Sequence, residues 1–133
     1  MSTKKNKEIV KKFFEEVLNH RNTDYLEGRI ATDYTNHNSS ILVQGPEGLK
    51  RVVQAQFKAF PDLHTTLEDI IAEGDKVVVR CTDHFTRQQD GVQVSIPWIE
   101  IIRLENGKLA EAWLETDTQL FSDQLIKEIE SKE

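Results

Sequence analysis

Glu100 is a carboxylate within an apolar run, SIPWIEIIRL, at residues 95–104. Isoleucines flank it on both sides, and its surroundings in the chain offer little else that is polar. Burial in such surroundings disfavours the charged form and raises the pKa of a carboxyl group. A group tuned in this way can take a proton from a carbon next to a carbonyl and return it to the enolate. Glu100 is therefore a candidate acid–base residue. The alternative is a strand carboxylate at the cavity mouth, either solvated or paired with Arg80 or Arg103.

Asp83 is a second carboxylate that breaks an apolar pattern, on the neighbouring predicted strand. Alternate residues of a strand share a face, and the other members of this face are Val77, Val79, Cys81 and Phe85. If both strands turn these faces inward, Asp83 and Glu100 form a pocket pair of one acid and one base. The alternatives are that Asp83 lies near the rim of the pocket or that it accepts a hydrogen bond from the preceding loop.

Metal and cofactor chemistry is not indicated. The histidines are scattered, at His20, His37, His64 and His84. They form no i,i+4 pair and no cluster with the one cysteine, Cys81, so the spacing typical of zinc or iron ligands is missing. The sequence has no phosphate-binding glycine loop, dinucleotide fingerprint or Gly-x-Ser-x-Gly elbow. We expect neither a metal nor a cofactor.

Composition narrows the class of protein. A chain of 133 residues fits one domain over residues 1–133. The net charge of −6 disfavours a nucleic-acid partner, and no apolar run approaches the roughly 20 residues that cross a bilayer. The single cysteine excludes an intramolecular disulfide framework. We expect a cytoplasmic protein without membrane contact.

The first half of the chain is predicted to be mainly helical. Apolar residues recur at helical spacing over residues 5–20, and capping residues precede a shorter helix near residues 25–31. Residues 33–38 are polar-aromatic and predicted to be extended. Another helix opens at the Gly-Pro pair of residues 45–46, and Pro61 closes it.

The second half has the alternation of strands. They are predicted over residues 63–72, 76–87, 92–104 and 108–117. A last helix carries Leu120, Phe121, Leu125, Ile126 and Ile129. Helices followed by a meander of long strands indicate an α+β fold, with helices on one face of an antiparallel sheet.

The hairpin between the last two strands decides where Glu100 points. A two-residue turn at residues 106–107 pairs Glu100 with Trp113, on a face rich in carboxylates. A three-residue loop at residues 105–107 pairs Glu100 with Ala112 instead. The second register gathers an apolar face with small residues opposite large ones: Ile96, Trp98, Ile102, Ala110, Ala112, Leu114 and Thr116. We adopt it because that face leaves room for a ligand.

The two tryptophans fall on opposite faces in this register. Trp98 is then a pocket wall that can stack on a flat or hydrophobic ligand, or alternatively an ordinary core residue. Trp113 packs on the outer side of the sheet, where a dimer contact is plausible.

Nearly the whole chain resembles a known family in the order of its segments. The segments that carry the resemblance are NKEIVKKFFEEVLN, ATDYTNHN, GPEGLKRVV, AFPDLHTTLEDIIAEGDKVVVR and RLENGKLAEAWLETD. They are similar to the SnoaL-like polyketide cyclase branch of the nuclear-transport-factor-two-like superfamily. This superfamily hosts cyclases, isomerases, hydrolases and non-catalytic binders on one scaffold, so the resemblance is more specific for fold than for activity.

The resemblance implies a cone: a curved antiparallel sheet wrapped on N-terminal helices, enclosing a small-molecule pocket. It implies that Tyr34, Asn36 and His37 line the pocket mouth, where Asn36 and His37 could hold a carbonyl or a water; the alternative is that they cap the loop. It places pocket acids and bases at the positions of Glu100 and Leu114. It also implies a homodimer through the outer sheet face.

One departure from the family pattern bears on activity. The cyclase pattern after the hairpin runs Glu-His-Trp-Asp, and the last residue is the catalytic acid–base. Here the run is Glu111-Ala112-Trp113-Leu114, so both polar pocket residues are apolar. Two hypotheses follow. The first is a cofactor-independent cyclase- or isomerase-like enzyme in which Glu100 moves a proton on a small hydrophobic carbonyl compound. The second is a non-catalytic protein that binds a hydrophobic ligand.

Overall fold

The computed structural model describes residues 2–38 and 42–116. The chain opens with helix α1, Thr3–Phe13, capped by the Ser2 hydroxyl, which accepts a hydrogen bond from the Lys5 backbone N–H at 3.1 Å. The helix continues as a π-helix, Phe14–Asn19. Its buried side chains include Val10, Phe13, Phe14 and Val17. The apolar spacing of the sequence is thus confirmed as helical, while the widening of the last turns was not predicted.

The predicted helix near residues 25–31 is wrong. The structure has a single 3₁₀ turn, Thr23–Leu26, and then enters strand β1, Ile30–Asn38. Gly28 lies between them at a φ of 73°, a left-handed conformation that stops a right-handed helix. β1 therefore begins before the polar segment at residues 33–38.

Helix α2, Gly45–Ala59, has proline in its first turn, as predicted. It follows the short strand β2, Leu42–Gln44. Its buried residues are Leu49, Val53, Ala55 and Ala59. The helix ends two residues before Pro61, which cannot continue it because proline lacks the backbone N–H.

Four long strands complete the described chain: β3 His64–Glu73, β4 Lys76–Thr86, β5 Gln93–Glu105 and β6 Lys108–Thr116. The strand order in the sheet is β2-β1-β6-β5-β4-β3. Neighbouring strands run antiparallel except β1 and β6, which are parallel. The fold is α+β, a curved and unclosed sheet with helices, although one strand pair departs from the predicted antiparallel order.

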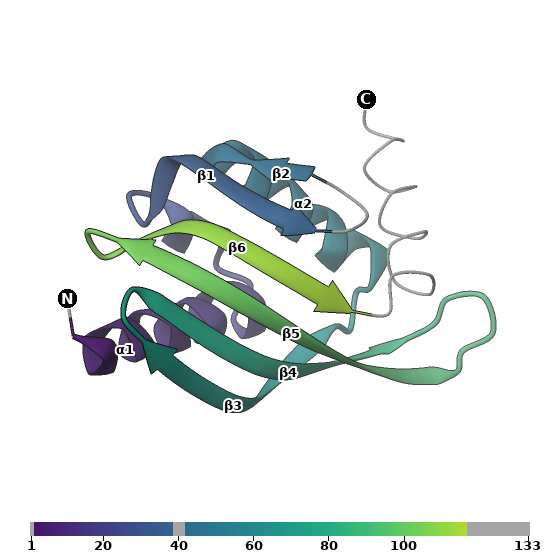
Figure 1. Ribbon diagram of the computed structural model, residues 1–133. Helices are drawn as coiled ribbons and strands as arrows, with labels where there is room; N and C mark the ends of the chain where they lie inside the picture. Colours follow the sequence, from purple (N-terminus) through teal and green to yellow (C-terminus); the bar gives the residue numbers. More distant parts are fainter. Residues whose placement is uncertain (1, 39–41, 117–133) are drawn as a thin grey trace.

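The helices cover one face of the sheet. In Figure 1 both α1 and α2 lie behind the strands, and the opposite face is turned toward the reader. The covered face, here called the inner face, carries Val77, Val79, Cys81, Ile102 and Ala112 in one core with α1 and α2. The opposite face is called the outer face. This division positions every candidate site residue, because alternate residues of one strand lie on different sides.

The hairpin between β5 and β6 differs from both predicted registers. Its turn has two residues, Asn106 and Gly107, with φ values of 53° and 76° that are typical of a type I′ turn. An irregularity follows on β6, where Ala110 is an extra residue, so Glu100 pairs with Leu114. The predicted pairing of Glu100 with Ala112 is therefore wrong. The predicted face is right, because the extra residue restores the parity that a plain two-residue turn would reverse.

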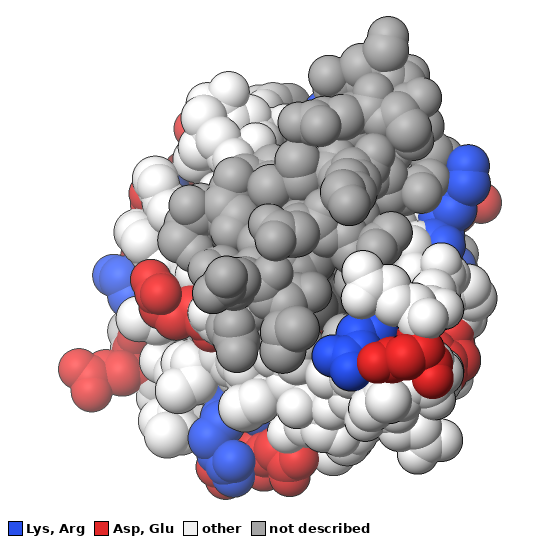
Figure 2. All heavy atoms as spheres, turned by 90° about the vertical axis from the view of Figure 1, so that its right-hand side faces the viewer, with Lys and Arg blue, Asp and Glu red and all other residues white. Residues whose placement is uncertain are grey.

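The predicted last helix, with Leu120 and Leu125, lies outside the described residues. Among the helices of the described part, none is long and apolar enough to cross a membrane. On the side of the molecule in Figure 2, the coloured acidic and basic side chains lie close together in small mixed groups.

Candidate active site

Glu100 lies on the inner face of β5, between Val79 of β4 and Leu114 of β6. Both direct neighbours across the sheet are therefore aliphatic. The two arginines named above as alternative partners pair with other carboxylates: Arg80 with Asp69, and Arg103 with Glu105 and Glu111. Glu100 makes no ion pair within the described part of the chain.

Asn36 is the polar partner of Glu100. Its Nδ2 donates a hydrogen bond to Glu100 Oε2 at 3.2 Å and another to the Tyr34 hydroxyl oxygen, also at 3.2 Å. Asn36 and Tyr34 are 7% and 2% exposed. The parallel register of β1 with β6 sets Asn36 beside Ala112. Ala112 lies two residues before Leu114, which is the residue of β6 opposite Glu100. Three of the predicted site residues are thus joined in one hydrogen-bonded group, in which Tyr34 and Asn36 are buried and Glu100 is partly buried.

The electrostatics of Glu100 follow from this environment. Burial raises its pKa from 4.5 to about 7; the Asn36 hydrogen bond opposes the rise, and the negative charge of Asp83 adds to it. A carboxyl group with a pKa near neutrality is present both as acid and as base at physiological pH. Burial and the nearby Glu100 also raise the pKa of Tyr34, so its hydroxyl stays protonated.

Asp83 lies on the same inner face, paired across the sheet with Ile96. Its side chain is 6% exposed and accepts a hydrogen bond from the Thr65 hydroxyl at 2.7 Å. Burial raises the pKa of Asp83, against the lowering effects of Thr65 and the Trp98 indole. Thr65 was not predicted, because a threonine at a strand start is ordinary; only the pairing of β3 with β4 brings it opposite Asp83.

Trp98 lies on β5, two residues before Glu100 and two residues after Ile96, which pairs with Asp83 of β4. Its ring contacts Phe14 of the π-helix, with ring centroids 5.8 Å apart. Its Nε1 is buried and has no hydrogen-bond partner within hydrogen-bonding geometry among the described residues, although it lies close enough to Asp83 to lower that pKa. Asn36 Oδ1 is likewise buried without a described partner. Buried polar atoms without partners are rare in folded proteins and call for an explanation.

Ala112 and Leu114 are the apolar neighbours of this group. Ala112 is fully buried and joins the main core. Leu114 is partly buried and lies directly across from Glu100. Ala112 and Leu114 thus lie on the inner face beside Asn36 and Glu100, respectively. Their part in binding a ligand stays a prediction.

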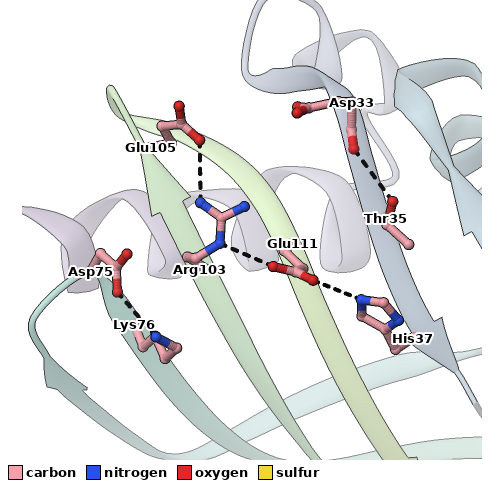
Figure 3. Close-up of polar contacts among 8 residues, drawn as sticks. All are labelled: Asp33, Thr35, His37, Asp75, Lys76, Arg103, Glu105 and Glu111. Carbon is pink, nitrogen blue, oxygen red and sulfur yellow. Dashed lines mark hydrogen bonds and ion pairs between the residues drawn. The ribbon is translucent and has the colours of Figure 1, made fainter.

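His37 is not part of this group. It follows Asn36 along β1 and points to the outer face, where its Nε2 lies 2.8 Å from Glu111 Oε2 (Figure 3). Its ring stacks on Trp113 with centroids 5.4 Å apart. The prediction treated Asn36 and His37 alike, but neighbouring residues of a strand point in opposite directions.

No metal-binding group of three or more His, Cys, Asp or Glu residues occurs among the described residues. A cleft of about 260 Å³ lies at the hairpin end of the sheet, lined by Asn6, Gly74, Asp75, Leu104, Asn106 and Gly107. It contains none of the predicted site residues. A ligand pocket at Glu100 therefore stays a prediction.

Comparison with known proteins identifies a family. The sequence model of the SnoaL-like polyketide cyclase family matches residues 8–125, which is most of the chain. No curated protein matches.

Solved structures agree with this match. A candidate SnoaL-like polyketide cyclase from Jannaschia sp. CCS1 has 22% identity and a TM-score of 0.80, covering 92% of each chain. A candidate polyketide cyclase from Acidithiobacillus ferrooxidans has 26% identity and a TM-score of 0.77, covering 96% of this chain and 99% of its own. A Catenulispora acidiphila protein with a ketosteroid-isomerase-like fold, solved with trimethylamine, has 15% identity and a TM-score of 0.76, covering 88% and 91%. The similarities to the Jannaschia and Catenulispora proteins concern the fold alone.

Proposed function

Because the chain belongs to the SnoaL-like polyketide cyclase family, we propose that it is a cofactor-independent enzyme of the cyclase or isomerase type. In this proposal Glu100 moves a proton on a small hydrophobic carbonyl compound. The observation that carries it is the position of Glu100: a carboxyl group with a pKa of about 7, without an ion pair among the described residues, directly across from Leu114.

The position of Leu114 matters because the family pattern has its catalytic carboxylate there. Residues directly opposite on antiparallel strands have Cβ atoms about 4.5–5.5 Å apart. Glu100 and Leu114 are such a pair. A carboxyl group at either position therefore reaches nearly the same region of the inner face, from β5 in one case and from β6 in the other.

The second missing polar residue has a similar neighbour. The family pattern has histidine at the position of Ala112, and Asn36 lies beside Ala112 on β1. Asn36 donates to Glu100 Oε2, which leaves Oε1 without a bond from this amide. Asn36 is therefore proposed to fix the carboxyl group while its other oxygen exchanges the proton.

The proposed chemistry begins with ionised Glu100 as the base. It takes a proton from the carbon next to the carbonyl, and the electron pair of the broken C–H bond moves onto the carbonyl oxygen as an enolate. The Tyr34 hydroxyl and the Trp98 Nε1–H are buried donors near Glu100 and could stabilise that oxygen. In an isomerisation, protonated Glu100 then returns the proton to another atom of the substrate. In a ring closure, the enolate carbon first forms a bond to a second carbonyl carbon of the substrate, whose C=O electron pair becomes an alkoxide, and protonated Glu100 gives its proton to that alkoxide.

A non-catalytic binder is the second candidate, and the residues at positions 112 and 114 favour it. Ala112 and Leu114 present hydrocarbon where the family pattern has an imidazole and a carboxylate. In that case the inner face holds a hydrophobic ligand, with Trp98 as one wall, and the protonated form of Glu100 donates a hydrogen bond to it.

A proton-exchange assay separates the two candidates without the natural substrate. A panel of hydrophobic ketones and 1,3-diketones is incubated in D₂O, and the loss of α-protons is followed by ¹H NMR. The enzyme should accelerate exchange for some members, and Glu100→Gln should reduce that rate by about 10²–10⁴-fold, as expected for loss of a general base. Glu111→Gln, on the outer face, is the matched control and should exchange at the wild-type rate.

Binding is measured on the same proteins through Trp98 fluorescence in a Trp113→Phe background. Equal affinity in wild type and Glu100→Gln, together with lost exchange, supports the enzyme. Binding without exchange in the wild type supports the binder, and no binding of any panel member counts against a hydrophobic carbonyl ligand.

A further inference from the structure

The cleft at the hairpin end of the sheet is separate from the candidate active site. Its lining comes from the β3–β4 turn at residues 74–75, the β5–β6 turn at residues 106–107, Asn6 of α1 and Leu104 of β5. In Figure 1 both turns lie on the same side of the picture as the start of α1. Leu104 is four residues from Glu100 along β5, which is about 13 Å in an extended strand. A molecule in this cleft of about 260 Å³ therefore does not occupy the space around Glu100.

Asn6 is a polar residue on the buried stripe of α1. It is 3% exposed, and the next buried residues of the stripe are Val10 and Phe13. Its Nδ2 donates to the Gly74 carbonyl oxygen at 3.5 Å, which is long for a hydrogen bond. Its Oδ1 is buried and has no hydrogen-bond partner among the described residues. An unpaired buried acceptor lowers stability, and asparagine is a poor helix former, so the fold alone does not account for this residue.

The other polar side chains of the cleft belong to the two turns. The Asp75 carbonyl oxygen accepts a hydrogen bond from the Leu104 backbone N–H at 2.8 Å, which holds the β3–β4 turn against β5. The Asp75 side chain is 55% exposed, and its ion pair with Lys76 at 3.4 Å is weak because both groups are solvated. Asn106 has a φ of 53° and brings a second amide to the lining. The side chains of the cleft thus offer one carboxylate and two amide oxygens as acceptors.

We propose that this cleft is a second binding site, which takes a small molecule with a guanidinium head group. A guanidinium is planar and carries five or more N–H donors, and a carboxylate accepts two of them side by side. The Asp75 carboxylate binds one edge of the group, and the amide oxygens of Asn6 and Asn106 accept N–H groups of the other edges. The amide of Asn6 can turn its oxygen to the ligand, because the long bond to Gly74 holds it only weakly.

The same set of side chains suits a divalent metal ion less well. Calcium and magnesium ions take six or more oxygen ligands, usually with several carboxylates among them. The described lining of the cleft holds one carboxylate, that of Asp75. A planar group with a single charge and many donors matches one carboxylate and two neutral acceptors better.

The first test titrates the ¹⁵N-labelled protein with methylguanidinium chloride, up to about 50 mM at constant ionic strength. The backbone signals of both turns and the side-chain amide signals of Asn6 and Asn106 should shift and saturate, with a dissociation constant of about 1–10 mM. Tetramethylammonium has the same charge and no N–H donor, and it should give no saturable shift. The absence of saturable shifts with methylguanidinium, or equal shifts with both cations, overturns the proposal.

The second test removes the acceptors one at a time. Asn6→Leu and Asp75→Asn should each raise the dissociation constant of methylguanidinium by at least about 5-fold, as expected for the loss of one hydrogen-bond acceptor. Asp33→Asn is the matched control, because Asp33 is exposed and lies outside the cleft, and it should bind like the wild type. Binding by Asn6→Leu at the wild-type affinity overturns the proposal, since Asn6 would then contact water only.

The stability of Asn6→Leu is an independent readout. Leucine is close to asparagine in size and removes the unpaired acceptor, so the melting temperature without ligand should rise by about 3 °C. In the wild type, 50 mM methylguanidinium should raise the melting temperature relative to the same concentration of tetramethylammonium, and this difference should be absent in Asn6→Leu. A lower melting temperature for Asn6→Leu would mean that the asparagine serves the fold, which overturns the proposal.

Discussion

Two glutamates of adjacent strands show how the two faces of this sheet differ. Glu100 on the inner face has aliphatic neighbours and one amide partner, Asn36. Glu111 on the outer face lies between His37 and Arg103 (Figure 3). Burial raises the pKa of Glu100 to about 7, whereas the hydrogen bonds from His37 and Arg103 lower the pKa of Glu111.

The difference comes from the alternation of side chains along a strand. Asn36 and His37 are consecutive residues of β1. Asn36 points inward and hydrogen-bonds Glu100, whereas His37 points outward and hydrogen-bonds Glu111. An outward carboxylate can be solvated and paired with cations. An inward one keeps a neutral amide, which holds the group without supplying the charge that would keep it ionised. Perturbed carboxyl groups of this kind cluster at functional sites.

The largest expected effect concerns the pH dependence of stability in Glu100→Gln. Because the folded-state pKa of Glu100 is raised to about 7, its contribution to stability is fully present below the unfolded pKa near 4.5 and is lost as pH rises through 7. Glutamine has no such loss. At pH 8 the variant should be more stable than the wild type by about 2–3 kcal/mol, and the difference should vanish near pH 4. Urea unfolding at a series of pH values measures it.

Glu111→Gln is the control for this pH dependence. Its stability difference from the wild type should change with pH in the opposite direction. The pKa of Glu111 is lowered in the folded state, so its contribution is present above the unfolded pKa and is lost as pH falls through the folded one. The variant should be less stable than the wild type at neutral pH. Slopes of the same sign in the two variants would contradict the contrast between the faces.

Asn36→Leu should have the next largest effect. It removes the hydrogen bond that favours ionised Glu100, so the pKa of Glu100 should rise above 7. Stability at pH 8 should fall by about 1–3 kcal/mol, because a buried carboxylate loses its donor, and the loss should be smaller near pH 4. An unchanged Glu100 pKa in this variant, measured by NMR, would show that the amide does not hold the carboxyl group.

Moving the carboxyl group across the strand pair should produce a smaller change. In the double variant Glu100→Leu, Leu114→Glu, the carboxyl group again lies on the inner face, opposite an aliphatic residue. Its pKa should stay above the usual value for glutamate, and α-proton exchange lost in Glu100→Leu should return in part. A carboxyl group at position 114 with an ordinary pKa would mean that the two positions do not share one environment.

His37→Ala should have the smallest effect on the inner site. It removes a partner of Glu111, whose pKa should move up toward its usual value. The pKa of Glu100 should remain about 7, because His37 faces the other side of the sheet. A change in the pKa of Glu100 as large as that in Asn36→Leu would contradict this, because it would mean that the two faces form one electrostatic network.

Much of this arrangement could be predicted from sequence. The alternation around Asp83 and Glu100 indicated two inward carboxyl groups, and the order of segments indicated the fold. The exact partner of Glu100 could not be predicted, because the extra residue at Ala110 has no signal in a run of small and apolar residues. His37 was grouped with Asn36 because the pairing of β1 with β6, which decides their faces, joins segments more than 70 residues apart.

The titration of the Glu100 side-chain carboxyl carbon, followed by ¹³C NMR with Glu100→Gln to assign the signal, tests the central claim most directly. Glu111 in the same spectra serves as the internal reference. The account predicts a pKa of about 7 for Glu100 and a value below the usual one for Glu111. A Glu100 pKa near 4.5 would mean a solvated carboxylate and would contradict a desolvated acid–base residue on the inner face.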